Sequence, residues 1–375
     1  MAIGLALRDM GIKPGEKVLL PAYHCLSMVD PVLWVGAKPV YYRVRGDASV
    51  DLEDIRARAD ECTRALVVAH YFGFPQPIDA IRALCDELGI VLLEDCAHAI
   101  LGEYHGHPLG SFGDYTIASP MKFYPIYDGG ILASHRRPLD QISLVPLGWR
   151  FSLRAAVIVL ERSLQYRRFG PMRYLLAPVF WLKSALLRAA KAVRPKRSEE
   201  WWGPAVGGLS SGRTGDFDPR WVDRRMSQTS RLLMGSASRR RLAEARRRNY
   251  QVLLERLSGL PGARPLFPTL PDGVVPLAFP LLVDEPEPIF HSLKLQGVPI
   301  MRFGEFLAEE IDERGYPEAV GLSRRVLQFP CHQEMRAAEL DWLAETIRTE
   351  ILTAAGTSRG SAGGDVGNTS IRSAR

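Results

Sequence analysis

The sequence predicts an α/β protein in which helices cover both faces of a mainly parallel sheet, followed by a smaller α+β unit. Within residues 1–135, continuous apolar runs alternate with helical patterns, which is typical of parallel strands buried on both faces. Residues 226–354 instead mix longer helices with a few strand-like pieces. The strands expected in the first region are 17–21, 38–42, 65–70, 90–93, 116–118 and 131–133.

Two helices are expected between these strands, at 29–35 and 78–88. In the second, apolar residues recur at helical spacing, and Gly89 follows as a C-cap. In the smaller unit we expect helices at 243–257, 288–296 and 338–352, and strands at 277–283 and 298–301. Residues 355–375 are almost all Gly, Ser, Ala, Arg and Asp, have little to bury, and are expected to be disordered.

Residues 136–225 form a basic, aromatic-rich insertion between the two units. From Arg136 to Arg197 there are fourteen Lys or Arg residues and only two acids. An amphipathic helix is expected at 174–193 and a flexible Gly/Ser loop at 203–215. Two interpretations are open: a solvated loop, or an amphipathic element that contacts anionic lipid headgroups peripherally through 136–200. Nucleic-acid binding is not favoured, because no known module accompanies the charge.

Composition places the chain among ordinary globular proteins, with 375 residues, 24% charged residues and a net charge of +6. Its five cysteines are odd in number and none lies in a CxxC pair, so neither a disulfide framework nor a metal site is indicated. No signal peptide or apolar run long enough to span a membrane is seen. We therefore expect a cytoplasmic protein with reduced thiols.

Four residues suggest chemistry. Lys122 lies among apolar neighbours, and desolvation favours the neutral, nucleophilic form of an amine. Asp95 ends an apolar strand, where ligand crevices of parallel sheets open, and His98 and Ser119 lie nearby in sequence. Pyridoxal 5′-phosphate needs both a lysine amine and a carboxylate for its ring nitrogen. Each residue also has an ordinary structural explanation: a surface lysine, a helix cap, a core histidine and a turn serine.

The order and spacing of several segments resemble the DegT/DnrJ/StrS family of sugar aminotransferases. The resemblance covers roughly residues 3–134 and 223–350. It rests on the segments 11–21, 36–40, 70–75, 94–99, 110–114, 119–122, 129–130, 297–300 and 327–332.

This resemblance implies a fold-type I pyridoxal phosphate enzyme that works as a homodimer. Lys122 would be the Schiff-base lysine, Asp95 the partner of the pyridine nitrogen, His98 the neighbour of the phenolic oxygen, and Ser119 a phosphate ligand. At the ring-stacking position the register offers Cys25, and the adjacent His24 or Tyr23 is expected to take that role. The implied reaction moves an amino group from glutamate to a nucleotide-linked keto-sugar, for surface polysaccharide or glycoconjugate synthesis.

Some features depart from the family pattern. Its Ser/Asn-Gly-Thr phosphate loop would precede Ala2, so either the true start lies upstream or cofactor binding is weakened. Ser119 and Lys122 are two residues closer than usual, and Asp223 falls near a partner-subunit Asn that commonly reaches the phosphate. The alternative function is therefore a catalytically impaired relative that acts as a membrane-peripheral scaffold or regulator.

Overall fold

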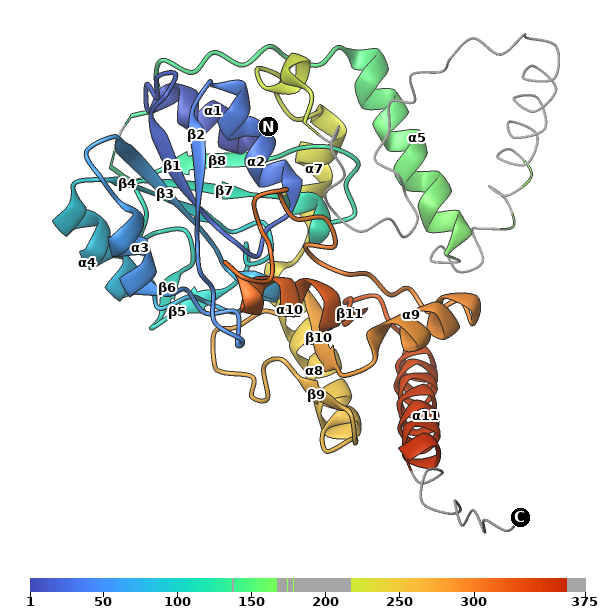
Figure 1. The fold of residues 1–375 in the computed structure, drawn as a ribbon. Coiled ribbons are helices and arrows are strands. Elements are labelled where there is room, and N and C mark those ends of the chain that lie inside the picture. Colours follow the sequence, from blue (N-terminus) through green and yellow to red (C-terminus); the bar gives the residue numbers. More distant parts are fainter. Residues whose placement is uncertain (137, 167–173, 175–177, 179–216, 363–375) are drawn as a thin grey trace, which may run out of the picture.

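The computed structural model describes residues 1–136, 138–166, 174, 178 and 217–362. Its first unit is built on a six-stranded sheet with strand order β2-β1-β3-β4-β7-β8 (Figure 1). All neighbours pair in parallel except β7 and β8, which are antiparallel. The strands are β1 Lys17–Pro21, β2 Lys38–Tyr42, β3 Thr63–Ala69, β4 Val91–Asp95, β7 Tyr115–Ala118 and β8 Ile131–Ser134.

Helices flank this sheet in two pairs (Figure 1). Helices α1 (Ala2–Asp9) and α2 (Leu26–Trp34) pack together, as do α3 (Leu52–Arg58) and α4 (Ile78–Leu88). Because both faces are covered, almost every residue of the central strands is buried. The predicted C-cap of α4 is confirmed, since Gly89 adopts the left-handed conformation at φ 65°. A short hairpin, β5 Glu103–Tyr104 and β6 His107–Pro108, lies outside the sheet.

The second unit is α+β, as predicted. Its antiparallel sheet has the order β11-β10-β9, and helix α11 packs on α8 and α9. The elements are α8 Arg239–Leu257, β9 Ala263–Pro265, β10 Ala278–Val283, α9 Pro286–Leu295, α10 Pro317–Arg325, β11 Val326–Pro330 and α11 Ala337–Ala362.

The two units share one hydrophobic core. Phe74 of the first unit stacks on Phe267 of the second with ring centroids 3.9 Å apart, and also contacts Tyr250. The backbone N–H of Leu277 donates to the carbonyl of Phe72 at 2.7 Å. The second unit is therefore fixed against the segment that follows β3.

Part of the insertion is described. Helix α5 (Trp149–Gln165) packs on α7 (Gln228–Ser236), and the short helix η4 (Pro219–Trp221) follows the gap. The expected helix at 174–193 and the loop at 203–215 lie outside the described residues, apart from Tyr174 and Pro178.

Two sequence predictions need correction, and some elements were not predicted. Residues 298–301 do not form a strand, because only Met301 makes a bridge, to Gln328 of β11. The short helix α3 was not predicted, although Asp51 caps it by accepting from the N–H groups of Glu53 and Asp54. Helix α11 continues to Ala362, so the expected disorder from residue 355 is wrong for 355–362. Within the described part of the chain, no helix is both long and apolar enough to cross a bilayer.

Candidate active site

A cavity of about 440 Å³ lies at the carboxyl ends of the parallel strands. Cys25 follows β1, His70 follows β3, Asp95 ends β4, and Ser119 follows β7; all four line it, together with Lys122. Consecutive strands run in the same direction, so their ends bring residues that are distant in sequence to one edge of the sheet. The sequence predictions for Lys122, Asp95, His98 and Ser119 thus converge on one cavity.

Lys122 ends the short helix η2 (Pro120–Lys122), and its backbone is held from the second unit. Arg246 Nη2 donates to the Lys122 carbonyl at 3.1 Å, and Gln333 Nε2 donates to the next carbonyl, that of Phe123, at 2.9 Å. Burial lowers the pKa of the Lys122 amine, while Cys25 and Asp95 oppose the shift. The environment therefore favours a neutral, nucleophilic amine.

Asp95 is 8% exposed, and its Oδ1 accepts from the Ala97 N–H at 2.8 Å. Residues 97–101 form turns, so the helix-cap explanation does not apply. Burial raises the pKa of Asp95, opposed by the Ala97 hydrogen bond and by the Lys122 amine. A cationic group next to this carboxylate would favour its ionised form, and a protonated pyridine nitrogen is such a group.

The His98 ring is neutral, and its hydrogen bond to the backbone determines which ring nitrogen carries the proton. Its Nδ1 accepts from the Phe72 N–H at 3.2 Å, so the proton of the neutral ring is on Nε2. Burial, together with the Lys122 amine, keeps the pKa of His98 well below its ordinary value. The Phe303 ring packs edge-on at 5.1 Å. The His98 Nε2–H can therefore donate to an anionic oxygen in the cavity.

The expectation for His24 and Tyr23 needs correction, because neither side chain lines the cavity. His24 Nδ1 lies 3.0 Å from the carbonyls of Pro21 and Ala22, and its Nε2 accepts from Ala308 N–H at 3.2 Å. Both ring nitrogens are thus used in holding the backbone.

The Tyr23 ring is fully buried against Tyr71 and Phe303. Cys25 takes the cavity position instead, with Sγ 2.9 Å from the Ser27 hydroxyl. The sequence around residues 23–25 offered two aromatic rings, and only the fold decides which residue faces inward.

The loop after Lys122 is tied to helix α7. The Asp128 carboxylate accepts from the hydroxyls of Ser227 and Ser230 at 2.6 and 2.5 Å, and from the Ser227 N–H at 2.8 Å. Gly129 has a φ of 120°, and an added Cβ would collide with the Met226 side chain. These contacts fix the lysine loop against the start of the second unit.

Several cavity residues were missed from the sequence. Phe303 comes from the second unit, and a further group comes from the insertion and its junction: Leu147, Phe151, Trp221, Arg224, Arg225 and Met226. No local pattern marks them, since their role depends on packing across the fold. Asp223, expected near the cofactor phosphate, pairs instead with Arg8.

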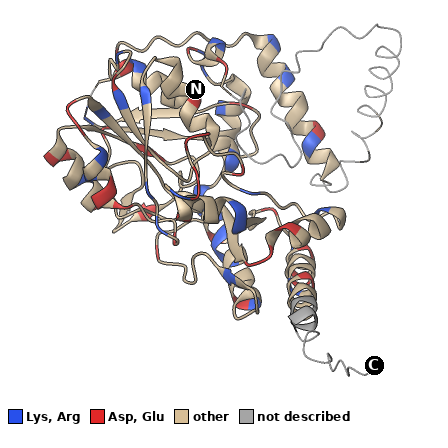
Figure 2. Ribbon diagram, viewed as in Figure 1, with Lys and Arg blue, Asp and Glu red and all other residues tan. Residues whose placement is uncertain are grey.

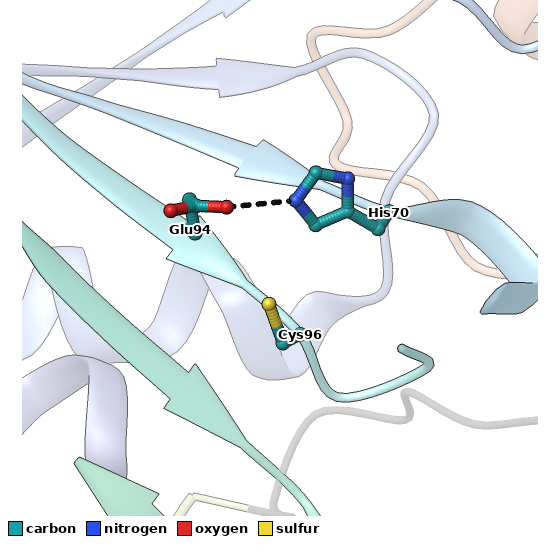
Figure 3. Close-up of side chains that lie close together, drawn as sticks. All are labelled: His70, Glu94 and Cys96. Carbon is teal, nitrogen blue, oxygen red and sulfur yellow. Dashed lines mark hydrogen bonds and ion pairs between the residues drawn. The ribbon is translucent and has the colours of Figure 1, made fainter. Parts of the chain in front are cut away.

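Next to the cavity, His70, Glu94 and Cys96 form a buried cluster (Figure 3). Glu94 accepts from His70 Nε2 at 3.1 Å and from the backbone N–H groups of Gly110, Phe112 and Gly113. Burial would raise the pKa of Glu94, but these hydrogen bonds outweigh it and lower the pKa. Both carboxylate oxygens of Glu94 accept these hydrogen bonds. They hold the 110–113 loop against the strand that ends at Asp95.

The fold is shared with solved aminotransferase structures. The structure of DesV from S. venezuelae superposes with a TM-score of 0.64 at 22% identity, covering 93% of this chain and 82% of that one. At this identity the match establishes the fold. Residues 1–143 match the DegT/DnrJ/EryC1/StrS aminotransferase family, which confirms the resemblance seen in the sequence.

Curated relatives agree with this family. The chain is 34% identical to a GDP-perosamine synthase from Vibrio cholerae over 138 residues. That match spans 36% of this chain and only 38% of the relative. The chain is also 26% identical to a dTDP-4-dehydro-2,3,6-trideoxy-D-glucose 4-aminotransferase from Saccharopolyspora spinosa. This longer match covers 93% of this chain and 82% of the relative.

Proposed function

We propose that this protein is a pyridoxal phosphate-dependent aminotransferase that acts on a nucleotide-linked keto-sugar. One observation carries the proposal: Lys122 and Asp95 both line the same cavity at the carboxyl edge of the sheet. Its volume of about 440 Å³ suits a cofactor-sized ligand. The nucleotide-sugar substrate follows from the names of the relatives. Glutamate as donor and a homodimeric assembly follow from the family resemblance.

The donor set fits the cofactor. Asp95 would hold the pyridine nitrogen protonated, and the His98 Nε2–H would donate to the phenolic oxygen. The hydroxyls of Ser119 and Ser27 also line the cavity and are suited to phosphate oxygens. When bound, pyridoxal phosphate supplies an electron sink for the carbanion formed beside the transferred nitrogen.

Lys122 has two roles in this proposal. Its amine would hold the cofactor covalently at rest, and its lowered pKa favours the neutral, reactive form of that amine. Lys122 Nζ would also take the proton from the substrate carbon that bears the amino group, and would later return a proton to the carbon that receives the amino group. The backbone contacts from Arg246 and Gln333 keep Nζ in place for both steps.

The first test is covalent attachment of the cofactor. Protein incubated with pyridoxal 5′-phosphate should gain a visible absorption band, and borohydride reduction followed by peptide mass mapping should place the label on Lys122. Lys122→Ala should lack both signals, whereas Lys38→Ala, which removes an exposed lysine, should keep them. Label on other lysines, with no dependence on Lys122, would refute the assignment.

The second test is transfer itself. With glutamate and candidate keto-sugar nucleotides, mass spectrometry should detect an amino-sugar nucleotide. Asp95→Asn should keep the label but lower kcat/KM by about a hundredfold or more, because a preorganised charge is lost. The scaffold alternative makes the opposite prediction: protein that stays colourless and gives no product under the same conditions.

A further inference from the structure

Helix α5 has an inner face that fixes it to the body of the protein. Ala155 is fully buried, and the Ser152 carbonyl accepts from the Thr229 hydroxyl at 2.7 Å. The Phe151 ring lies 5.8 Å from that of Trp221 and 6.1 Å from that of Tyr127. The orientation of the helix is therefore set by packing, which also determines what its other side exposes.

The outer face of α5 is apolar and open to solvent. Trp149 is 71% exposed, Leu153 57% and Leu160 37%. Their spacing of four and seven residues places them on one side of the helix. An exposed stripe that combines a tryptophan with two leucines marks an interaction surface, because soluble proteins rarely leave such residues grouped in water.

Cations accompany this stripe. Arg150 and Arg154 are exposed next to Trp149 and Leu153, and the Arg150 guanidinium lies 5.5 Å from the Trp149 ring centre. Figure 2 shows basic positions along α5. The surrounding sequence is also basic, with fourteen Lys or Arg and two acids between residues 136 and 197. Tryptophan and leucine on one face with arginine beside them is the composition of helices that lie in a membrane interface.

We propose that the outer face of α5, defined by Trp149, Arg150, Leu153, Arg154 and Leu160, docks the protein on an anionic lipid surface. Charge complementarity selects this occupant: the arginines are attracted to acidic headgroups while the apolar side chains enter the interface. A second copy of the chain suits the surface poorly, because a two-fold interface pairs the patch with itself and this patch has two arginines and no acid to pair with them. The contact is peripheral.

This docking would act beside the cavity. Phe151 and Leu147, on and just before the same helix, line the cavity wall. A lipid-bound α5 would therefore hold the cavity next to the membrane surface. The proposal is independent of the chemistry in the cavity, since it depends only on the outer face.

Co-sedimentation with vesicles tests it. The full chain should pellet with vesicles of phosphatidylcholine and phosphatidylglycerol in equal parts, and not with phosphatidylcholine alone; added salt should weaken the binding. Arg150→Gln with Arg154→Gln should lower the partition coefficient about 25-fold, because each cation contributes about fivefold at an anionic surface. Trp149→Ser with Leu153→Ser should abolish pelleting.

Matched controls separate this face from general charge attraction. Arg241→Gln with Arg248→Gln removes two exposed cations from α8, and Leu295→Ser removes a leucine that is 76% exposed on α9. Both should bind like the wild type. Absence of binding by the wild type, or an equal loss in the controls, would overturn the proposal. So would a change in oligomeric mass caused by the Trp149 and Leu153 substitutions, since that would assign the face to self-association.

Discussion

Replacement of Arg246 by methionine tests how the lysine loop is held. This guanidinium is 1% exposed and makes four hydrogen bonds, to Gln333 Oε1 at 2.7 Å and to the carbonyls of Leu277 at 2.9 Å, Lys122 at 3.1 Å and Pro276 at 3.3 Å. Because methionine fills the space of the aliphatic stem, the change chiefly removes the donors and the charge.

The expected loss can be worked from these contacts. A buried acceptor left without its donor costs about 1–3 kcal/mol. The Pro276 bond is long and contributes least, so the two better carbonyls and the Gln333 amide dominate the cost. Removal of a buried cation offsets part of it, because burial already lowers the pKa of Arg246. We expect a net loss of about 3 kcal/mol in the free energy of unfolding.

Urea unfolding followed by circular dichroism measures this loss. Arg248→Met is the matched control, since Arg248 is exposed on the same helix and should change stability by under about 0.5 kcal/mol. Arg246→Met should also weaken the visible band with pyridoxal phosphate, because the Lys122 carbonyl is released. A change in the free energy of unfolding below about 1 kcal/mol would show that the reasoning is wrong.

Two further predictions concern stability. His24 is buried and neutral with its pKa lowered to about 4, so unfolding takes up a proton below about pH 6.5, and stability should fall as the pH falls. Between about pH 6.5 and pH 5, the free energy of unfolding measured by urea titration should fall by about 2 kcal/mol. His98 acts in the same direction. A His24→Asn variant whose stability falls just as steeply with pH would contradict the assignment.

Gly73→Ala should cost about 3 kcal/mol or more by the same urea titration, because φ is 100° and an added Cβ would collide with the Val275 carbonyl oxygen. Gly89→Ala, with open space around it, should cost only about 1–2 kcal/mol. Equal costs at the two positions would count against the clash.

Local patterns in the sequence predicted most of the strands of the first unit. Strands β1 and β2 and helix α4 have the predicted bounds. An apolar run between turn residues has few alternatives to a buried strand. Helical spacing that ends at a glycine has few alternatives to a capped helix. The placement of Lys122 and Asp95 in one cavity was also predictable. Parallel strands end at the same edge of a sheet, whichever side chains they carry.

Other features depended on contacts across the chain. Which of residues 23–25 faces the cavity is decided by packing, since Tyr23 fits between Tyr71 and Phe303 and His24 bonds to backbone, leaving Cys25 at the surface of the cavity. Arg246, more than a hundred residues after the lysine, could not be linked to it by any local pattern. Sequence alone predicted the strands of the first sheet and the chemistry at their ends. The tertiary structure decided which side chains complete the cavity and which face of α5 remains open, because both depend on contacts between distant segments.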